Sequence, residues 1–301
     1  MAATSDLPYK TAPALWAGVG ARARTEAKAL GVNPGDIVDE FVFGRFLARI
    51  FADPEAPWVL KGGMAMLARV RDARATRDID LLRSAGELEA AIEALEHDAA
   101  RGLGDHFRFQ RATRRGSGGL TQPDVEGVRI TFDAYCGVKK VRTVSVDLVV
   151  GSTMTAPPWT ARAATRLPIG EPPTVRLYPV VDHIADKLCA MHALYRGMPS
   201  SRERDLIDLL IFARTEPVDA TALKTAVDAE WTSRDLEGPP RFEPPTEWAK
   251  NFSKQAAASP RTAGWTFDDA VACVRAFLSP ATGDGPHDGR WDPGYAIWHQ
   301  A

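Results

Sequence analysis

The sequence has little cysteine and no long apolar run. Its cysteines, Cys136, Cys189 and Cys273, are far apart, with no CxxC pair and no zinc-ligand spacing. This excludes a disulfide framework and a zinc module, and favours reduced thiols in a cytoplasmic protein. No run of about eighteen apolar residues is present, and residues 1–13 lack the apolar segment of a secretion signal. We therefore expect a cytoplasmic protein with no membrane contact.

A strong net charge is also missing. The chain carries 37 Lys and Arg residues against 39 Asp and Glu residues, for a net charge of -2. A protein coated in positive charge, such as a histone-like binder, is thereby excluded, so any contact with nucleic acid must be local. The 301 residues, 45% of them hydrophobic, suffice for about two domains with a sizeable core.

Strands and helices alternate in the first half of the chain. The apolar periodicity and the turn residues predict helices at 14–30, from 34 onward and at 64–70, and strands at 58–60, 77–82, 107–111, 128–135 and 141–150. Ser84 and Glu87 have the spacing of a capping box, which predicts a further helix through Leu95.

A proline-rich connection from 157 to 179 separates this region from a mostly helical remainder. Helices are predicted there at 180–196, 200–214, 220–230 and 266–278. We therefore predict an α+β protein with an N-terminal domain over residues 1–165 and a mostly helical C-terminal domain over 166–301.

Three aspartates are the candidate catalytic residues. Asp78 and Asp80 alternate with apolar Ile79 in a strand pattern, so both carboxylates lie on one face. Asp147, between Val146 and Leu148, lies on a later strand with the same pattern. Paired carboxylates with a third nearby suit two divalent cations that bridge a triphosphate. A lone DxD is most often only a solvated strand end.

Upstream of the aspartates, Gly62 and Gly63 join a strand to a helix. Backbone N–H groups at such a turn can face phosphate, although a GG pair is most often an ordinary turn. The order of strand, GG, helix, DxD and a later apolar-Asp-apolar strand resembles the polymerase-beta-like nucleotidyltransferase superfamily. The resemblance implies a mixed sheet with packed helices.

Further segments narrow this resemblance. They are Lys61-Gly62-Gly63, then Arg74 to Leu81, Asp147, Lys187-Leu188, and an R-x-x-D-x-x-D helix formed by Arg202, Asp205 and Asp208. Together they are similar to the AbiEii/MenT family of nucleotidyltransferase toxins over about residues 58–212.

The family resemblance implies roles for individual residues. Catalytic roles would belong to Asp78, Asp80, Asp147, Lys187 and Asp208. The nucleotide would be bound by Lys61, Gly62, Gly63, Thr76, Arg77, Arg202 and Asp205. The three candidate aspartates would hold two Mg²⁺ ions, with Mn²⁺ as an alternative, and the substrate would be an NTP. A 3'-hydroxyl would attack the α-phosphate with loss of pyrophosphate. The acceptor implied is the 3' end of tRNA, and the partner is a cognate antitoxin.

The second half leaves its own alternatives open. Lys187 lies at the border of an apolar helix stripe, where it can reach a triphosphate or simply be solvated. Arg202, Asp205 and Asp208 lie near one helix face, as a salt-bridged structural group or as an active group. In the active interpretation, Asp208 positions Lys187 or contacts the nucleotide.

Two further hypotheses concern the surroundings of the carboxylates. Basic residues precede and follow the DxD segment, which suggests a local basic rim for RNA phosphates; they are Arg69, Arg71, Arg74, Arg77, Arg108, Arg111, Arg114, Arg115, Lys139, Lys140 and Arg142. Thr76 lies two residues before Asp78. Phosphorylation there would add about two negative charges where the triphosphate must bind.

Three other functions remain open from the sequence. The same carboxylates could serve transfer to a small-molecule or protein hydroxyl, or the fold could be a catalytically silent binding module. The presence of all three aspartates disfavours the silent module. A DxD glycosyltransferase is disfavoured by the upstream GG and by Lys187 with its R-x-x-D-x-x-D helix.

Overall fold

The computed structural model describes residues 7–70, 76–84, 86–116, 126–192, 202–257, 259–283 and 285–300. The predicted rim residues Arg71 and Arg74, and the predicted helix limits at 196 and 200, lie outside these ranges. None of the helices in the described ranges is long and apolar enough to cross a membrane.

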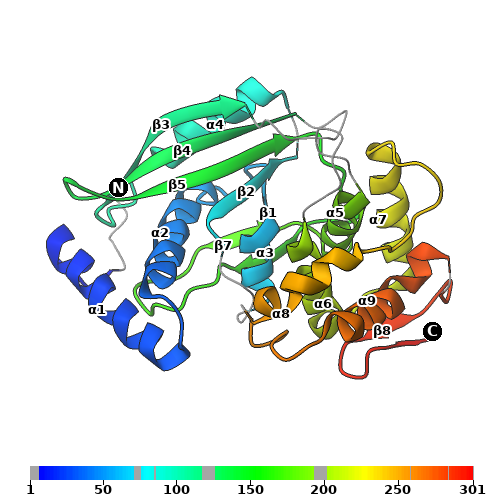
Figure 1. The fold of residues 1–301 in the computed structure, drawn as a ribbon. Helices are drawn as coiled ribbons and strands as arrows, with labels where there is room; N and C mark the ends of the chain where they lie inside the picture. Colours follow the sequence, from blue (N-terminus) through cyan, green and yellow to red (C-terminus); the bar gives the residue numbers. More distant parts are fainter. Residues whose placement is uncertain are drawn as a thin grey trace.

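A mixed seven-stranded sheet forms one part of the described structure (Figure 1). Its spatial order is β3-β4-β5-β2-β1-β7-β6. Strand β2 pairs with β5, and β1 with β7, in parallel, while the other neighbours are antiparallel. The strands are β1 (Trp58–Lys61), β2 (Asp78–Arg83), β3 (Phe107–Gly116), β4 (Glu126–Cys136), β5 (Lys139–Val150), β6 (Trp159–Arg162) and β7 (Thr174–Leu177).

Helices flank the sheet and form the second half of the chain. In the first half they are α1 (Ala12–Leu30), α2 (Pro34–Ile50), α3 (Gly62–Arg69) and α4 (Leu88–Ala99). In the second half they are α5 (Val180–His192), α6 (Glu203–Thr215), α7 (Ala220–Ser233), the short 3₁₀ helix η1 (Thr246–Trp248), α8 (Ala249–Ala256) and α9 (Phe267–Thr282). A small hairpin of β8 (Arg290–Asp292) and β9 (Ile297–His299) follows. The α+β class and the mixed sheet are confirmed.

Local sequence signals explain several helix starts. Asn33 caps α2 by accepting a hydrogen bond from the backbone of Gly35, and Pro34 occupies the first turn, as predicted. The capping-box prediction was wrong. Glu87 is the N-cap residue of α4 without a side-chain cap bond, and the Ser84 hydroxyl donates to the carbonyl of Pro57 instead. The loop before α4 is therefore bonded to the start of β1.

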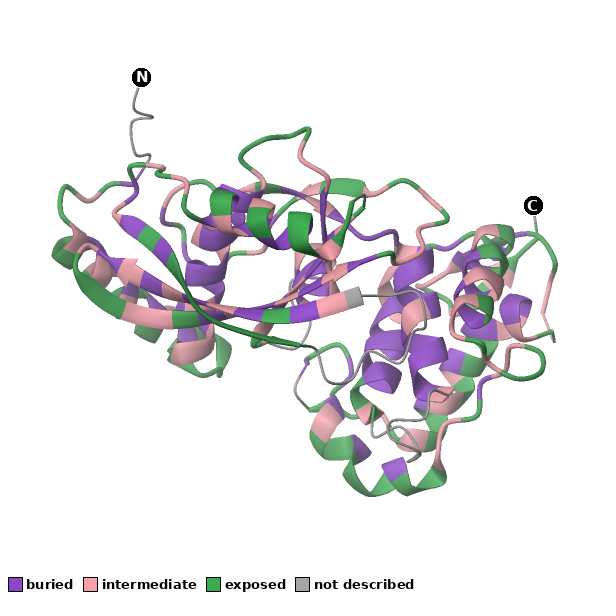
Figure 2. Ribbon diagram, turned by 90° about the horizontal axis from the view of Figure 1, so that it is seen from above, coloured by how far each residue is buried: buried purple, intermediate pink, exposed green. Residues whose placement is uncertain are grey.

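One hydrophobic cluster joins the sheet to the helices. On one face of the sheet, the ring of Phe46 in α2 packs against Phe109 and Phe132. The same cluster continues through Ile79 of β2 into Leu188 and Phe277 of the helical part. Figure 2 shows buried residues in the interior of both parts, which lie side by side. The sheet and the helices of the second half thus pack on a common core.

The predicted connection at 157–179 is more than a linker. It contributes β6 and β7, and β7 inserts beside β1, with Leu60 and Leu177 in register. Tyr178 follows directly, and α5 begins two residues later at Val180. The chain therefore enters the helical part next to the start of α3. The division into domains near residue 165 stays a prediction.

Candidate active site

The three candidate aspartates share one face of two neighbouring strands. Asp80 of β2 and Asp147 of β5 are direct Cα partners, and Asp78 lies two residues before Asp80. The intervening Ile79 and Val146 are fully buried on the other face. The alternation predicted from the sequence thus brings the three carboxylates to the same side of the sheet.

Asp80 lies where charges of both signs meet. Burial raises the pKa of its carboxyl from 3.8 to about 6, and the negative charge of Asp147 adds to this rise. The positive charges of Lys187 and Lys61 act in the opposite direction. The fold therefore brings lysines from α5 and β1 to the carboxylates of β2 and β5.

The two glycines sit against the DxD strand. Gly62 has a φ of +57°, and a Cβ there would lie 1.8 Å from Oδ2 of Asp80. A Cβ on Gly63 would lie 2.8 Å from the Thr76 side chain. Helix α3 begins at Gly62, so its free backbone N–H groups start beside Asp80. Only glycine permits this close approach of the helix start to the carboxylate.

Thr76, Lys61 and Arg77 surround this turn. The half-buried Thr76 donates a hydrogen bond of 3.2 Å to the carbonyl of Asp78. Lys61 donates from Nζ to Ser152 Oγ at 3.2 Å, and the same Nζ lies 4.3 Å from the centroid of the Tyr178 ring. Arg77 is exposed directly before the DxD strand. Lys61 is thus held by contacts to the residue after β7 and to the loop after β5.

Lys187 is buried between two aspartates of the next helix. Its Nζ donates to Asp205 Oδ1 at 3.0 Å and to Asp208 Oδ2 at 2.6 Å. Asp208 is fully buried, whereas Arg202 is about half exposed at the N-cap of α6, 3.5 Å from Asp205. The simply solvated lysine is therefore excluded. Of the alternatives for Asp208, the geometry favours positioning Lys187 over direct contact with a nucleotide.

A buried charge network holds α5 in place. Arg234 of α7 donates to Asp186 of α5 and to Glu230, and Arg234 is nearly buried. The positive charges of Lys61 and Arg234 overcome burial and hold the pKa of Asp186 below its usual range. Next to it, burial lowers the pKa of His183 to about 3, so this imidazole is neutral. These contacts fix the helix that carries Lys187.

Arg129 of β4 is a site residue that the sequence analysis missed. It is the antiparallel partner of Asp147 and donates two hydrogen bonds to it, Nε to Oδ1 at 2.7 Å and Nη2 to Oδ2 at 2.5 Å. Its Nη2 also lies 3.9 Å from Oδ2 of Asp78. Only the pairing of β4 with β5 could have revealed it, because the two residues are 18 positions apart.

The carboxylates have the chemistry of a magnesium or manganese site. Carboxylate oxygens are the hard donors that both ions prefer. A cation, the guanidinium of Arg129, already lies against Asp147 and Asp78. Among the described residues, no three Asp, Glu, His or Cys side chains are close enough together to hold a metal ion as they stand. The residues present therefore fit a divalent cation, and one of them, Asp147, is paired with the guanidinium of Arg129.

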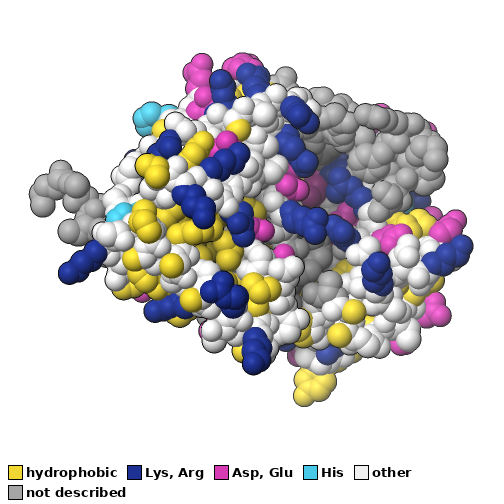
Figure 3. Space-filling model, turned by 60° about the vertical axis from the view of Figure 1, so that its left-hand side comes forward, with side chains coloured by type: hydrophobic (Ala, Val, Ile, Leu, Met, Phe, Trp, Pro, Cys, Tyr) yellow, Lys and Arg dark blue, Asp and Glu magenta, His cyan; other side chains and the backbone are white. Residues whose placement is uncertain are grey.

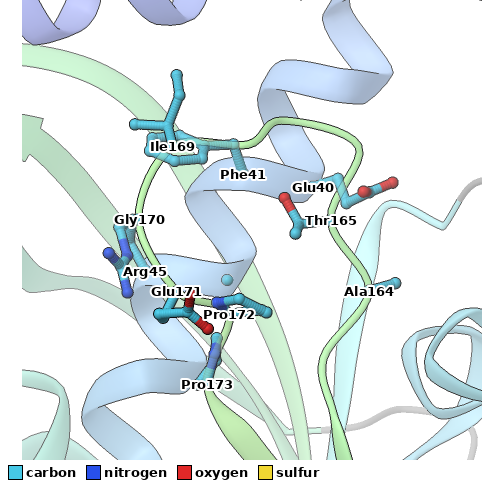
Figure 4. A pocket seen from close by; sticks show the side chains of 11 residues that line it. Glu40, Phe41, Arg45, Ala164, Thr165, Ile169, Gly170, Glu171, Pro172 and Pro173 are labelled. Carbon is cyan, nitrogen blue, oxygen red and sulfur yellow. The ribbon is translucent and has the colours of Figure 1, made fainter. Parts of the chain in front are cut away.

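Figure 3 shows Asp and Glu side chains within a hollow of the surface, with Lys and Arg side chains around it. A separate small pocket lies between α2 and residues 164–173 (Figure 4). Phe41, Arg45 and Ile169 line it, and the adjoining Glu40 is paired with Arg166. A second pocket is also lined by Glu40, together with Met64 and Thr76. The pocket of Figure 4 is thus built from α2 and the loop before β7.

A DxD strand, a third aspartate on the parallel neighbour and a glycine turn against the DxD are the pattern expected of a nucleotidyltransferase site. The chain belongs to the family described as nucleotidyl transferase AbiEii toxin of type IV toxin–antitoxin systems, whose model matches residues 45–273. The predicted family and enzyme class are confirmed. Membership implies an NTP substrate and an antitoxin partner.

Solved structures resemble the chain at low identity. MenT4, a nucleotidyltransferase toxin from Mycobacterium tuberculosis H37Rv, is 19% identical, with 87% of this chain and 99% of that chain covered and a TM-score of 0.49. JHP933 from Helicobacter pylori is 12% identical, with 83% and 90% covered and a TM-score of 0.42. No curated protein matches the chain.

Proposed function

We propose that this toxin-family nucleotidyltransferase transfers a nucleoside monophosphate from an NTP to the 3'-hydroxyl of an RNA. The acceptor end of tRNA is the proposed target, and its extension blocks aminoacylation and translation. The observation that carries the transfer chemistry is the pairing of Asp80 with Asp147 on neighbouring strands, with Asp78 on the same face.

The aspartates are the proposed metal ligands. Asp78 and Asp80 would hold both ions, and Asp147 would hold one of them. Bound there, Mg²⁺ supplies a lowered pKa for the attacking hydroxyl and neutralises charge on the leaving pyrophosphate. We assign to Asp147 the further role of accepting the proton of that hydroxyl.

The glycine turn and two lysines are the proposed phosphate-binding groups. The backbone N–H groups at the start of α3 are next to Asp80, and a helix N-terminus favours an anion. Lys187 and Lys61 bring positive charge close enough to oppose the rise in the pKa of Asp80 that burial causes. Asp205 and Asp208 keep the Lys187 ammonium in place through two hydrogen bonds.

The RNA acceptor is supported by local charge rather than by net charge. Lys and Arg side chains surround an acidic hollow although the whole chain has a charge of -2 (Figure 3). A basic border around such a hollow suits phosphates of a single-stranded RNA end. The family resemblance points to tRNA among RNAs.

The test is a transfer assay with each of the four α-labelled NTPs. The purified protein is incubated with total RNA, and in parallel with RNA whose 3' ends have been oxidised with periodate. We expect label in the tRNA size range with intact RNA and none with oxidised RNA.

The other outcomes separate the alternative functions. Label transferred to a protein or metabolite extract but not to RNA would establish another hydroxyl acceptor. Absence of transfer to the RNA, to the protein extract and to the metabolite extract would support the catalytically silent module.

A further inference from the structure

Arg129 occupies the position of a counter-ion within the carboxylate site. As the antiparallel partner of Asp147, it projects from the same face of the sheet at the closest cross-strand position. Its two hydrogen bonds take one oxygen each from the Asp147 carboxylate. This bidentate arrangement is the strongest geometry available to an arginine and a carboxylate.

The charges around Arg129 explain why it stays there. Its hydrogen bonds to Asp147, and then the negative charges of Asp147, Asp78 and Asp80, raise the pKa of the guanidinium. Without a cation, Asp80 is also repelled by the other two carboxylates. Arg129 relieves that repulsion at Asp147 and reaches Asp78 at 3.9 Å.

The contact is nevertheless reversible. The side chain of Arg129 is 48% exposed, and that of Asp147 is 26% exposed. An ion pair at this depth is screened by solvent and contributes modestly to stability. A divalent cation that approaches Asp147 must displace or share both of its oxygens with the guanidinium, and it also meets the positive charge of Arg129.

We infer that Arg129 competes with the catalytic divalent cation for Asp147, and so lowers the affinity of the free enzyme for metal. This inference rests on the proposed function, since it assumes that Asp147 is a metal ligand. In it, Arg129 is a positioning residue that acts through Asp147. Removal of the guanidinium makes both Asp147 oxygens available, and metal binding in the absence of NTP becomes tighter.

The test is a Mn²⁺ titration of the full chain without NTP, followed by electron paramagnetic resonance of free Mn²⁺. Arg129→Met is expected to lower the Kd about three- to tenfold relative to wild type, which corresponds to loss of an ion pair at a partly exposed site. Arg129→Lys keeps the positive charge but cannot donate to both Asp147 oxygens at once. Its Kd for Mn²⁺ should therefore lie between those of wild type and Arg129→Met.

Arg108→Met is the matched control. Arg108 is an exposed arginine of β3 that stacks over Tyr135, and its loss changes the net charge equally. The Kd of Arg108→Met for Mn²⁺ should equal that of wild type. An equal decrease in Arg108→Met would mean that only overall charge matters, and would overturn the inference. An unchanged or higher Kd in Arg129→Met, with an unaltered circular dichroism spectrum, would also overturn it.

Asp147→Asn separates this inference from the proposed function. If Asp147→Asn weakens Mn²⁺ binding while Arg129→Met leaves it unchanged, Asp147 is a ligand and only the competition is wrong. If Asp147→Asn binds Mn²⁺ as wild type does, the proposed metal site itself is wrong. If the double variant Arg129→Met/Asp147→Asn loses the tightening, the effect of Arg129 acts through Asp147 as inferred.

Discussion

Asp80 and Asp147 are direct partners on the parallel strands β2 and β5, so two negatively charged carboxylates lie next to each other at the centre of the site. Burial and this neighbour together raise the pKa of Asp80 to about 6. Above that pH the folded protein carries an ionised Asp80 that burial disfavours. A group held in such an unfavourable state is typical of functional sites, where stability is reduced in favour of activity.

Asp80→Asn should abolish nucleotide transfer without loss of stability. Loss of a carboxylate that holds metal removes several kcal/mol of charge stabilisation, so we expect at least about 100-fold slower transfer and no growth arrest on expression. Because ionised Asp80 is disfavoured by burial at neutral pH, the Tm should be equal to or higher than that of wild type.

Asp133→Asn is the control for Asp80→Asn. Asp133 lies further along β4, forms an ion pair with Lys140 and accepts a hydrogen bond from the Thr143 hydroxyl. Its replacement should leave transfer at the wild-type rate. Wild-type transfer or toxicity in Asp80→Asn would refute the role assigned to this carboxylate.

Gly62→Ala should inactivate the protein through a collision with Asp80. The added Cβ would lie 1.8 Å from Asp80 Oδ2, so the helix start and the carboxylate must separate. Gly31→Ala is a matched control, because Gly31 has a similar φ of +68° but no atom within 4 Å of the added Cβ. In both variants the free energy of unfolding should fall by about 1 kcal/mol, because alanine is disfavoured in the left-handed conformation. Only Gly62→Ala should lose transfer, and equal activity of the two variants would contradict the arrangement.

Asp208→Asn should destabilise the protein because it breaks a buried ion pair with Lys187. Loss of one partner in a buried pair costs about 3 kcal/mol in the free energy of unfolding. Asp228→Asn breaks the exposed pair with Lys224, which has the same N–O distance of 2.6 Å, and should cost about 0.5 kcal/mol or less. Urea unfolding followed by circular dichroism measures both. Similar values for the two variants would show that the buried pair has no special role.

Thr76→Glu should weaken NTP use, because its carboxylate would lie beside Gly63 and the DxD strand. A repulsion worth about 1.4 kcal/mol would raise KM for the NTP about tenfold. Thr76→Val, which removes the hydroxyl but adds no charge, should stay within about threefold of wild type, a difference of under 1 kcal/mol. The same KM for Thr76→Glu and wild type would contradict the placement of the triphosphate near this residue.

Phosphorylation of Thr76 is tested by mass spectrometry after co-expression with the antitoxin. Unmodified Thr76 in a protein whose activity is suppressed would reject that hypothesis.

The elements around the site were predictable where their patterns are local. The alternation of Asp78, Ile79 and Asp80 identified β2, and Asn33 with Pro34 marked the start of α2. The prediction failed at Ser84, whose hydroxyl bonds to Pro57 rather than to its own helix. The prediction also missed β6 and β7, because the prolines in 157–179 indicate a loop and the two strands between them are short.

The charged residues and the strand face that they share can be read from the order of amino acids, since alternation along a strand is a property of successive residues. Which of these charges come into contact depends on how the strands and helices pack. The β4–β5 register sets Arg129 against Asp147, and the packing of α5 on α6 buries Lys187 between Asp205 and Asp208. Such contacts join positions far apart in the chain, and the free energy that selects them comes from the packing of the whole sheet and its helices, which no local pattern contains.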